Sequence, residues 1–427
     1  MPSTSSCPEL KAESTALLTA LARFGACGAT PGGGITRLCA SKADGLARDL
    51  FQDIAKANGA IVKTDAVGNQ FAHFQLAAAG ASAVMMGSHL DSQSRAGRYD
   101  GTLGVATALQ VGAALMVQRQ SGAIFTADFI AVNWTNEEGA RFRPSLLGSG
   151  VYAGAFSADY ALARRDDQDI LLGDALAGIG YLGVDTPPPT PACYLELHVE
   201  QGCVLETEGA DIGVVCRNWG ATKIDARFWG EQAHTGPTKM ETRRDAMLAA
   251  AYAIADIRDV ASRWPGRVHT SVARILVEPN AANVMPAHVT IAVEIRAADD
   301  ILLDLATKAG EAALVQAASR ANVTYETIAR SVRQVRSLPA APAALVRQCA
   351  AAIGLRSLDM DTIAGHDAIS LLGTCPIGLI FVPSIGGVTH NEAEATAEKD
   401  IIAGLALCTM AASQLCRAGG MAEATLP

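Results

Sequence analysis

Short apolar runs that alternate with segments of helical length are the feature that most restricts what this chain can fold into. In the first part of the chain, the runs that predict strands lie at 60–62, 70–74, 83–88 and 125–134. Residues 41–58 and 104–118 have the length and composition of helices. Strands that are apolar on both faces and separated by helices are typical of an α/β sheet covered on both sides. We therefore predict an α/β fold for this part.

The pattern changes between about 214 and 330, where the elements follow the order strand, helix, strand, strand, helix, strand. The strands are expected at 222–230, 270–277, 287–296 and 324–329, and the helices at 240–262 and 300–321. This βαββαβ order is that of a ferredoxin-like domain. Residues 331–427 return to apolar helices and a Gly/Pro-rich apolar run. The sequence thus predicts a discontinuous catalytic domain, 1–213 and 331–427, with a ferredoxin-like domain inserted at 214–330.

Composition supports a large folded protein and argues against several partners. Of the 427 residues, 50% are hydrophobic and 18% are charged, which provides material for more than one buried core. The net charge of −9 argues against a nucleic-acid partner, which normally requires a basic surface. The most apolar stretch, 369–388, contains Pro376 and Pro383 and is not expected to cross a membrane.

The cysteines and the N-terminus indicate a cytoplasmic location. None of the ten cysteines forms a CxxC pair, so we expect buried, reduced side chains rather than a disulfide framework. Residues 1–13 are polar and lack the apolar core of a signal peptide.

Two polar motifs follow the third predicted strand. The segment Gly-Ser-His-Leu-Asp at 87–91 lets His89 present a ring nitrogen to a metal ion, while Asp91 can hold the other nitrogen. The alternative is a His–Asp pair that caps a loop. In Tyr-Asp-Gly at 99–101, glycine lets the backbone turn and directs Asp100 to the same place, although Asp-Gly is also an ordinary turn.

Adjacent carboxylates follow the apolar run that ends at Trp134. Glu137 and Glu138 repel each other unless a cation lies between them or one of them holds a proton. One of the two can bind a metal ion while its neighbour serves as general base on the activated water. A solvated turn is the alternative reading of this motif.

Two further histidines occur in polar motifs at or after apolar runs. His198 lies in Glu-Leu-His-Val-Glu at 196–200, where strand alternation places both glutamates on its face. His390 lies in Thr-His-Asn-Glu, after the apolar run 377–383. A set of His, Asp and Glu ligands without cysteine favours a catalytic Zn, Mn, Co or Ni centre over a structural zinc site.

Taken together, these segments resemble a known enzyme family. The matching segments are GSHLDSQSRAGRYDG, TNEEGARF, ELHVEQG, GEQAHTGPTKMETRRDA, EPNAANVMPAHV, EIRAAD, AGHDA and PSIGGVTHNEAE. They look like the amidase/hydantoinase/carbamoylase branch of the dinuclear aminoacylase-type metallohydrolases. That branch includes N-carbamoyl-L-amino-acid amidohydrolases, β-ureidopropionases and allantoate amidohydrolases. The resemblance runs in order from about residue 20 to residue 415.

The resemblance implies two divalent metal ions, with Zn²⁺ preferred over Mn²⁺, Co²⁺ or Ni²⁺. Asp100 would bridge the two ions. His89 and His198 would complete one site, and Glu138 and His390 would complete the other. A hydroxide that bridges the ions would be the nucleophile, and the centre would keep a net positive charge that suits an anionic intermediate.

The resemblance also implies roles for groups that contact the substrate. Glu137 would be the general base, and His234 would stabilise the oxyanion, with a buried structural histidine as the alternative reading. Arg296 projects from the polar face of its strand and would bind a substrate carboxylate, with a surface salt bridge as the alternative. The remaining substrate contacts would be Gln201, Asn283, Gly365 and His366.

The implied reaction is hydrolysis of an N-carbamoyl amino acid, a small anionic substrate, to the amino acid, CO2 and ammonia. In this family the inserted domain is a lid that also forms a homodimer interface. Three positions depart from the family pattern: Ala96 and Ile363 stand where glycine is usual, and Lys239 where proline is common. Lys239 would meet an additional anionic group, and Ile363 would narrow the pocket.

Other functions remain open at this point. One is hydrolysis of allantoate, another ureido acid or an N-acyl compound. Another is a non-catalytic protein that binds a metal ion or ligand on the same scaffold, which would not need Glu137. A third is a peptidase, although the peptidase branches usually have a carboxylate where His198 stands.

Overall fold

The protein consists of two compact units. The computed structural model describes residues 8–421. Among these residues, unit 1 runs to Cys216 and resumes over Leu338–Met360 and from Gly365 onward, whereas unit 2 comprises Arg217–Ser337 and Asp361–Ala364. Unit 2 thus extends past the predicted end at 330 and includes a short segment that the sequence places in the catalytic domain.

Two contacts attach the segment 361–364 to unit 2. Arg217 Nη2 donates a hydrogen bond to Asp361 Oδ2 at 2.6 Å, and Trp219 N donates one to Thr362 O at 2.8 Å. Both contacts join residues more than a hundred positions apart, so no local sequence pattern predicts them.

Unit 1 is built on a mixed sheet whose central strands run parallel. The strand order is β1 (Ile61–Thr64), β2 (Gln70–Phe74), β4 (Asp128–Trp134), β3 (Ala83–His89), β5 (Cys193–Val199), β15 (Ile377–Val382), β6 (Ile212–Asn218) and β13 (Arg336–Ser337), and β14 (Ser357–Thr362) also pairs with β6. β3 runs parallel to β4 and β5, and β5 runs parallel to β15. The carboxyl ends of these four strands therefore meet at one edge of the sheet.

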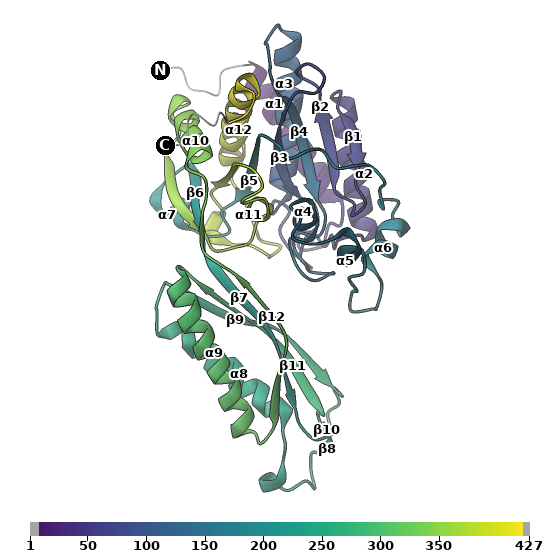
Figure 1. Ribbon diagram of the computed structural model, residues 1–427, viewed down its shortest axis with the longest axis vertical. Helices are drawn as coiled ribbons and strands as arrows, with labels where there is room; N and C mark the ends of the chain where they lie inside the picture. The colour runs from purple at the N-terminus through teal and green to yellow at the C-terminus, as the bar shows by residue number, and fades with distance from the viewer. Residues whose placement is uncertain (1–7, 422–427) are drawn as a thin grey trace. The chain divides into compact units, whose positions relative to one another are not determined.

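Helices bury both faces of this sheet, as the apolar strands predict (Figure 1). One face packs against α1 (Pro8–Ala26), α2 (Lys42–Ala57), α3 (Thr102–Gln120), α10 (Ala340–Ala352) and α12 (Glu398–Ala418). The other packs against α4 (Leu147–Tyr152), α7 (Val204–Glu208) and α11 (Asp367–Ser370). In β3, Val84 and Met86 face the first layer and Met85 faces the second.

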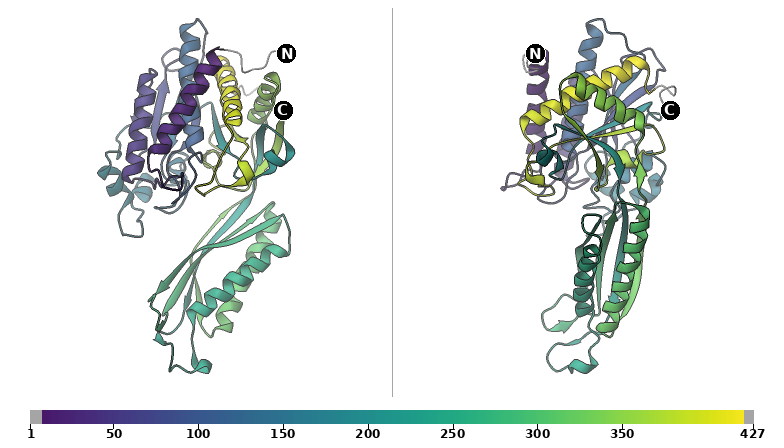
Figure 2. Two further views of the ribbon diagram at one scale, coloured as in Figure 1. Left: turned by 180° about the vertical axis from the view of Figure 1, so that it is seen from behind. Right: turned by 90° about the vertical axis from the view of Figure 1, so that its left-hand side faces the viewer.

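By length and composition, α12 is long and apolar enough to cross a membrane. Half of its most apolar window is buried within the protein. It packs there against α3 and α10, on the face of the sheet that also carries α1 (Figure 2). A helix of the protein core has this same length and composition.

The segment between β4 and β5 contains short helical pieces, as the sequence indicates. α5 (Ala158–Leu162) and α6 (Leu172–Gly178) pack around Phe142 in a small separate cluster. β4 begins at Asp128, later than the predicted residue 125. The backbone amides of Thr126 and Ala127 donate to Cys416 O at 2.9 Å, so this stretch pairs with the end of α12 instead of the sheet.

Unit 2 follows the element order that the sequence indicates. Its main elements are β7 (Gly220–Trp229), α8 (Ala246–Ser262), β9 (Val268–Glu278), β11 (His288–Ala297), α9 (Asp300–Arg320) and β12 (Thr324–Arg333). The strands form an antiparallel sheet in the order β12–β7–β11–β9, and α8 and α9 lie side by side on one face (Figure 1). Residues alternate along β11 between buried and half-buried positions. The assignment of this unit as a ferredoxin-like lid stays a prediction.

Two local expectations are wrong. The helix predicted from 240 begins at Ala246, because the Asp245 side chain accepts the Leu248 N–H at 3.0 Å and caps it there. Cys203 is exposed, and Cys27 and Cys216 are half-buried, so the expectation of buried cysteines fails for these three. The other cysteines that the structure describes are buried, and Cys7 lies outside the described residues.

Candidate metal centre

The predicted metal ligands come together at the carboxyl edge of the four parallel strands. His89 is the last residue of β3, and His198 lies one residue before the end of β5. Glu137 and Glu138 follow β4, and His390 follows β15 after the short 3-10 turn η3 (Ile385–Gly387). Motifs that are far apart in sequence therefore meet because their strands are neighbours and run in the same direction.

Asp100 lies at the centre of this group, directly before α3. Its Oδ1 atom is 3.1 Å from His198 Nε2 and 3.5 Å from His89 Nε2. Its Oδ2 atom is 3.4 Å from His390 Nε2, which is also 3.4 Å from Glu138 Oε2. Two three-residue groups with the spacing of metal ligands result, and Asp100 belongs to both. This is the bridging arrangement that the family resemblance implies.

Backbone hydrogen bonds fix the orientation of two histidine rings. His89 Nδ1 lies 2.9 Å from the main-chain oxygen of Asp91, and His198 Nδ1 lies 2.9 Å from that of Val199. A carbonyl oxygen can only accept, so each Nδ1 carries a proton, which leaves Nε2 as the ring nitrogen that can bind a metal ion. His198 Nε2 also accepts the Gly101 N–H at 3.2 Å, which requires the same tautomer. Both rings therefore fit a metal ion at Nε2.

The carboxylates at this edge are crowded, so their ionised forms need positive charge nearby. Glu138 Oε1 is buried and has no hydrogen-bond partner among residues 8–421. Burial, followed by the charge of Asp100, raises the pKa of Glu138. Burial also opposes ionisation of Asp100, but His198, His390 and His89 hold its pKa well below the usual range. Divalent cations would stabilise the ionised forms of both carboxylates, so the donor set fits the implied metal pair.

Glu137 lies beside this centre. Its Oε2 atom lies 3.6 Å from His89 Nε2. Burial raises the pKa of Glu137 well above its usual value; His89 lowers it, and the carboxylates of Asp367 and Glu138 add to the increase. A carboxylate with a raised pKa is a better base near neutral pH than an exposed one.

Asp91 supports the site differently from the prediction. Its carboxylate lies 3.9 Å from His89 Nδ1, so the main-chain oxygen, not the side chain, orients the ring. The two carboxylate oxygens instead accept the backbone N–H groups of Glu137 and Glu138, at 3.1 and 3.3 Å. Asp91 thus holds the loop that carries both glutamates.

Two neighbours of the candidate ligands escape sequence reasoning. Glu394 accepts the backbone N–H groups of Tyr99 and Asp100, both at 3.1 Å, and Gln93 Nε2 donates to Glu138 Oε2 at 2.9 Å. Glu394 lies within the predicted HNEAE segment, which is the available signal for it. Gln93 has no signal beyond its place between two motifs.

The predicted substrate contacts in unit 1 surround the same carboxyl edge. Gln201 has a positive φ of 61° and donates from Nε2 to Asp100 Oδ2 at 2.8 Å. His366 is buried, with its ring centroid 4.6 Å from that of His198. Gly365 directly precedes it at the start of α11. All three therefore lie near the metal ligands, although their role in substrate binding stays a prediction.

The predicted contacts in unit 2 occur at two separate places. His234 and Asn283 lie together, because β8 (Ala233–His234) pairs with β10 (Val284–Met285). His234 is exposed, so it is not a buried structural histidine. Arg296 lies near the other end of β11, where it donates to the Ile363 carbonyl and, at 3.0 Å, to Glu294 Oε1.

Comparisons with known proteins place the chain in a family. No family model matches the chain. It is 35% identical to an N-carbamoyl-L-amino-acid amidohydrolase of Rhizobium meliloti, over 85% of this chain and 86% of that protein. It is 29% identical to an allantoate amidohydrolase of Bacillus subtilis, over 90% of this chain and 93% of that protein. A crystal structure of a hydantoinase/carbamoylase family amidase from Burkholderia vietnamiensis matches with a TM-score of 0.90 and 35% identity. The match covers 95% of this chain and 97% of that protein. The chain belongs to the hydantoinase/carbamoylase family of amidases.

Proposed function

We propose that the protein hydrolyses the C–N bond of an N-carbamoyl amino acid to the amino acid, CO2 and ammonia. The observation that carries this proposal is the pair of ligand groups sharing Asp100, with Glu137 beside them at 3.6 Å from His89 Nε2. The relative from Rhizobium meliloti bears the name of this activity. A centre of two divalent ions, when bound, would lower the pKa of a coordinated water and polarise the carbamoyl oxygen.

The side chains would supply the proton transfers. Glu137 takes a proton from the attacking water and returns it to the leaving nitrogen as the C–N bond breaks. Its buried position supports this role, because burial raises the pKa of Glu137 and so makes it a stronger base. Asp91 keeps Glu137 in place through the backbone, so the base depends on an ordered loop.

Arg296 is proposed to bind the substrate carboxylate. Its guanidinium group donates to the Ile363 carbonyl and to Glu294, and these two contacts fix the orientation of the guanidinium plane. Because the carbonyl belongs to the backbone of Ile363, the contact itself does not depend on that side chain. The bulk of Ile363 would limit the substrate side chain that fits nearby.

The distance between the two groups of contacts supports the proposal of a homodimer through unit 2. Eight residues of β11 separate His288, near the His234 end, from Arg296, which corresponds to roughly 26 Å. One small substrate cannot touch both His234 and Arg296 of the same chain. We propose that His234 serves the site of a partner subunit. The edge strand β9, with Ile275 and Leu276 almost half exposed, supports an interface there.

Allantoate, another ureido acid or an N-acyl compound are the alternative substrates. The observation that favours them is the similarity to the allantoate amidohydrolase of Bacillus subtilis. Lys239 is exposed in unit 2 and would suit a substrate with a second anionic group.

Ammonia release tests the proposal. Metal-reconstituted protein is incubated with N-carbamoyl-L- and D-amino acids, carbamoyl-β-alanine, allantoate and N-acetyl amino acids, beside Glu137→Gln and the exposed control Glu208→Gln. We expect turnover of a carbamoyl amino acid that Glu137→Gln abolishes and Glu208→Gln leaves intact. Turnover of allantoate alone would select the alternative. Failure on every ureido compound, with metal bound, would reject the ureidohydrolase assignment.

A further inference from the structure

His390 is the histidine of the metal centre whose ring is least constrained. The rings of His89 and His198 are each fixed by a hydrogen bond from Nδ1 to a main-chain oxygen. Among residues 8–421, Nδ1 of His390 makes no such bond, and its side chain is 46% exposed. Its φ of +50° lies in the left-handed region, where a residue other than glycine needs support from its surroundings. The position of this ring therefore depends on how the backbone beside it is held.

Glu392, two residues after His390, connects this backbone to two other loops. Its Oε2 atom accepts hydrogen bonds from Arg95, with Nη2 at 2.8 Å and Nε at 3.2 Å. Its Oε1 atom accepts from the hydroxyl group of Thr30. Both partners are far from Glu392 in the sequence, and neither is a predicted metal ligand. We call the three residues Thr30, Arg95 and Glu392 the latch.

The two loops that bind Glu392 are already joined to each other. Ile35 and Ala96 form an antiparallel bridge, in which the two N···O distances are 2.9 and 2.8 Å. A Cβ atom on Gly32 would lie 2.5 Å from Glu392 Oε2, so this close approach of the carboxylate requires glycine. Glu392 therefore meets a preformed surface, and one of its two loops leads directly to the bridging aspartate.

The latch differs from an ordinary ion pair on the surface. An isolated exposed pair contributes little to stability, because water and salt screen its charges. Arg95 is indeed 74% exposed, but the side chain of Glu392 is only 15% exposed and accepts hydrogen bonds from two loops. The contribution of the latch is therefore geometric. It fixes one carboxylate and, through it, the backbone beside His390.

We propose that Glu392 is a positioning residue for the metal site that contains His390. The latch keeps His390 Nε2 near Asp100 Oδ2 and Glu138 Oε2, each of which is 3.4 Å away. The other group of candidate ligands contains no residue of this loop. Loss of the latch should therefore weaken the binding of one metal ion and spare the other.

Glu394 holds the same loop in a different way. It accepts the backbone N–H of Asp100, which belongs to both groups of candidate ligands. Loss of Glu394 should thus affect both ions, whereas loss of Glu392 should affect one. The inference rests on the metal pair of the proposed function, but it does not depend on which substrate is cleaved.

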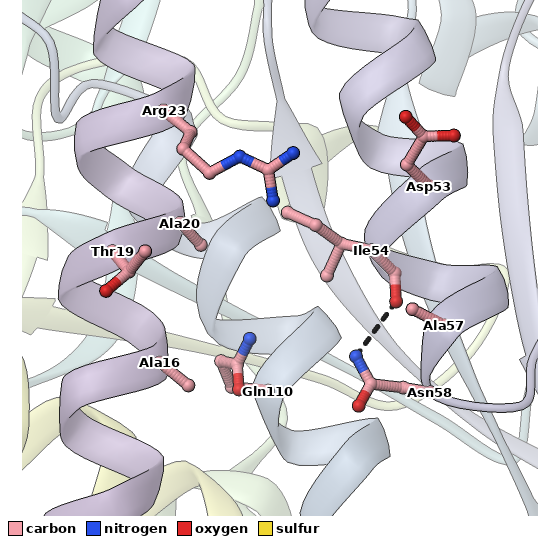
Figure 3. Close-up of a pocket in the computed structure, with 9 residues that line it drawn as sticks. All are labelled: Ala16, Thr19, Ala20, Arg23, Asp53, Ile54, Ala57, Asn58 and Gln110. Carbon is pink, nitrogen blue, oxygen red and sulfur yellow. Dashed lines mark hydrogen bonds between the residues drawn. The ribbon is translucent and has the colours of Figure 1, made fainter.

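Matched controls are available at an open hollow between α1 and α2 (Figure 3). Arg23 extends from α1 and Asp53 from α2, and both side chains are exposed. None of the residues that line this hollow belongs to the candidate metal centre or to the latch. Arg23→Met and Asp53→Ala therefore remove the same kinds of charge elsewhere in unit 1.

Titration of the full-length protein with Zn²⁺ tests the proposal. Bound metal is first removed, and competition with a chromophoric chelator then gives the number of tightly bound ions and the affinity for each. The variants are Glu392→Ala, Arg95→Met, Arg95→Lys, Gly32→Ala and the double variant Arg95→Met with Glu392→Ala. His390→Ala shows the behaviour of a protein with one complete site, and thermal melts of the metal-free protein show that each variant is folded.

We expect two bound ions in the unaltered protein. Glu392→Ala should lower the affinity for one of them about 10–100-fold, the usual effect of losing a group that orients a ligand. Arg95→Met and Gly32→Ala should act in the same direction, whereas Arg95→Lys keeps a cation and should recover most of the affinity. The double variant should bind no more weakly than Glu392→Ala, because both substitutions break the same interaction. The two control variants should bind both ions like the unaltered protein.

Unchanged affinity for both ions in Glu392→Ala overturns the proposal, as does an equal loss of both or an additive loss in the double variant. If Glu392→Ala does not fold, Arg95→Met decides, because an exposed side chain contributes little to folding. A single bound ion in the unaltered protein rejects the metal pair and the role of the latch with it. Two ions that depend on the latch, without ammonia release from any ureido compound, refute only the proposed reaction.

Discussion

Removal of the Glu394 side chain should weaken metal binding, although Glu394 is not itself a predicted ligand. Its Oε1 atom accepts the N–H groups of Tyr99 and Asp100, both at 3.1 Å, and its Oε2 atom accepts from Thr389 Oγ1 at 3.3 Å. These bonds fix the backbone immediately before and at the bridging aspartate. The side chain is also tightly packed, since a Cβ atom on Gly97 would lie 2.1 Å from it.

The size of the effect follows from the donors that lose their acceptor. A buried N–H left unsatisfied costs about 1–3 kcal/mol. Glu394→Ala leaves two of them, and Tyr99 is only half-buried, so we expect a loss of about 2–4 kcal/mol in the free energy of unfolding. Loss of a group that orients a metal ligand typically lowers metal affinity about 10–100-fold. Glu394→Gln keeps an acceptor oxygen of the same shape and should recover most of both quantities.

Two measurements on each variant separate stability from metal binding. Urea denaturation in the presence of a chelator gives the free energy of unfolding of the metal-free protein, and competition with a chromophoric chelator gives the affinity for Zn²⁺. Glu208→Ala removes an exposed carboxylate as the control. The reasoning would be refuted if Glu394→Ala bound Zn²⁺ like the unaltered protein, or if Glu394→Gln were as defective as the alanine variant.

Three further changes have defined outcomes. Gly101→Ala should lose metal, measured as bound Zn²⁺ per chain by atomic emission, because φ is +63° there and a Cβ would lie 2.4 Å from His89 Cε1. Phe228→Ala should lower the free energy of unfolding in urea by about 3–5 kcal/mol, because this side chain is fully buried in unit 2. Burial opposes ionisation of Glu294, but Arg296 lowers the pKa of Glu294 in the folded protein. The ionised side chain therefore contributes its full stabilisation above the pKa of glutamate in the unfolded chain, about 4.3. This stabilisation is lost as the pH falls through the lower pKa of the folded state. Glu294→Gln should therefore cost stability at pH 7 and cost progressively less below about pH 4.3 in thermal melts, and a pH-independent difference would contradict this.

The clustering of the candidate metal ligands could be predicted from sequence because their motifs follow recognisable strands. His89 and Glu138 come directly after apolar runs, and their strands turn out to be parallel neighbours. A pattern of residue types cannot predict which contacts the backbone makes in place of a side chain. The sequence assigns the Asp91 carboxylate to His89, yet the main-chain oxygen takes that position, and a main-chain oxygen has no residue type by which it could be recognised.

Contacts between residues far apart in the sequence could not be predicted, for a different reason. Glu394 meets the Asp100 backbone across nearly three hundred residues, and Asp361 joins unit 2 across more than a hundred. Such contacts depend on the path of loops after the strands, and loop paths have no periodicity to reveal them. Element boundaries were misjudged where a loop residue formed a competing contact, as Asp245 does at the start of α8.

The arrangement of unit 2 has a consequence that the sequence alone leaves open. His234 and Arg296 belong to the same unit and were both expected to contact the substrate, but β11 separates them by roughly 26 Å. No hinge motion between the two units can shorten a distance within one rigid sheet. Either one of the two residues does not contact the substrate, or each contacts a different substrate molecule. In the second case the two molecules lie in the two active sites of a symmetric dimer. We propose the second possibility, because it gives both residues the role that the family resemblance implies; under this proposal the reaction would require a dimer.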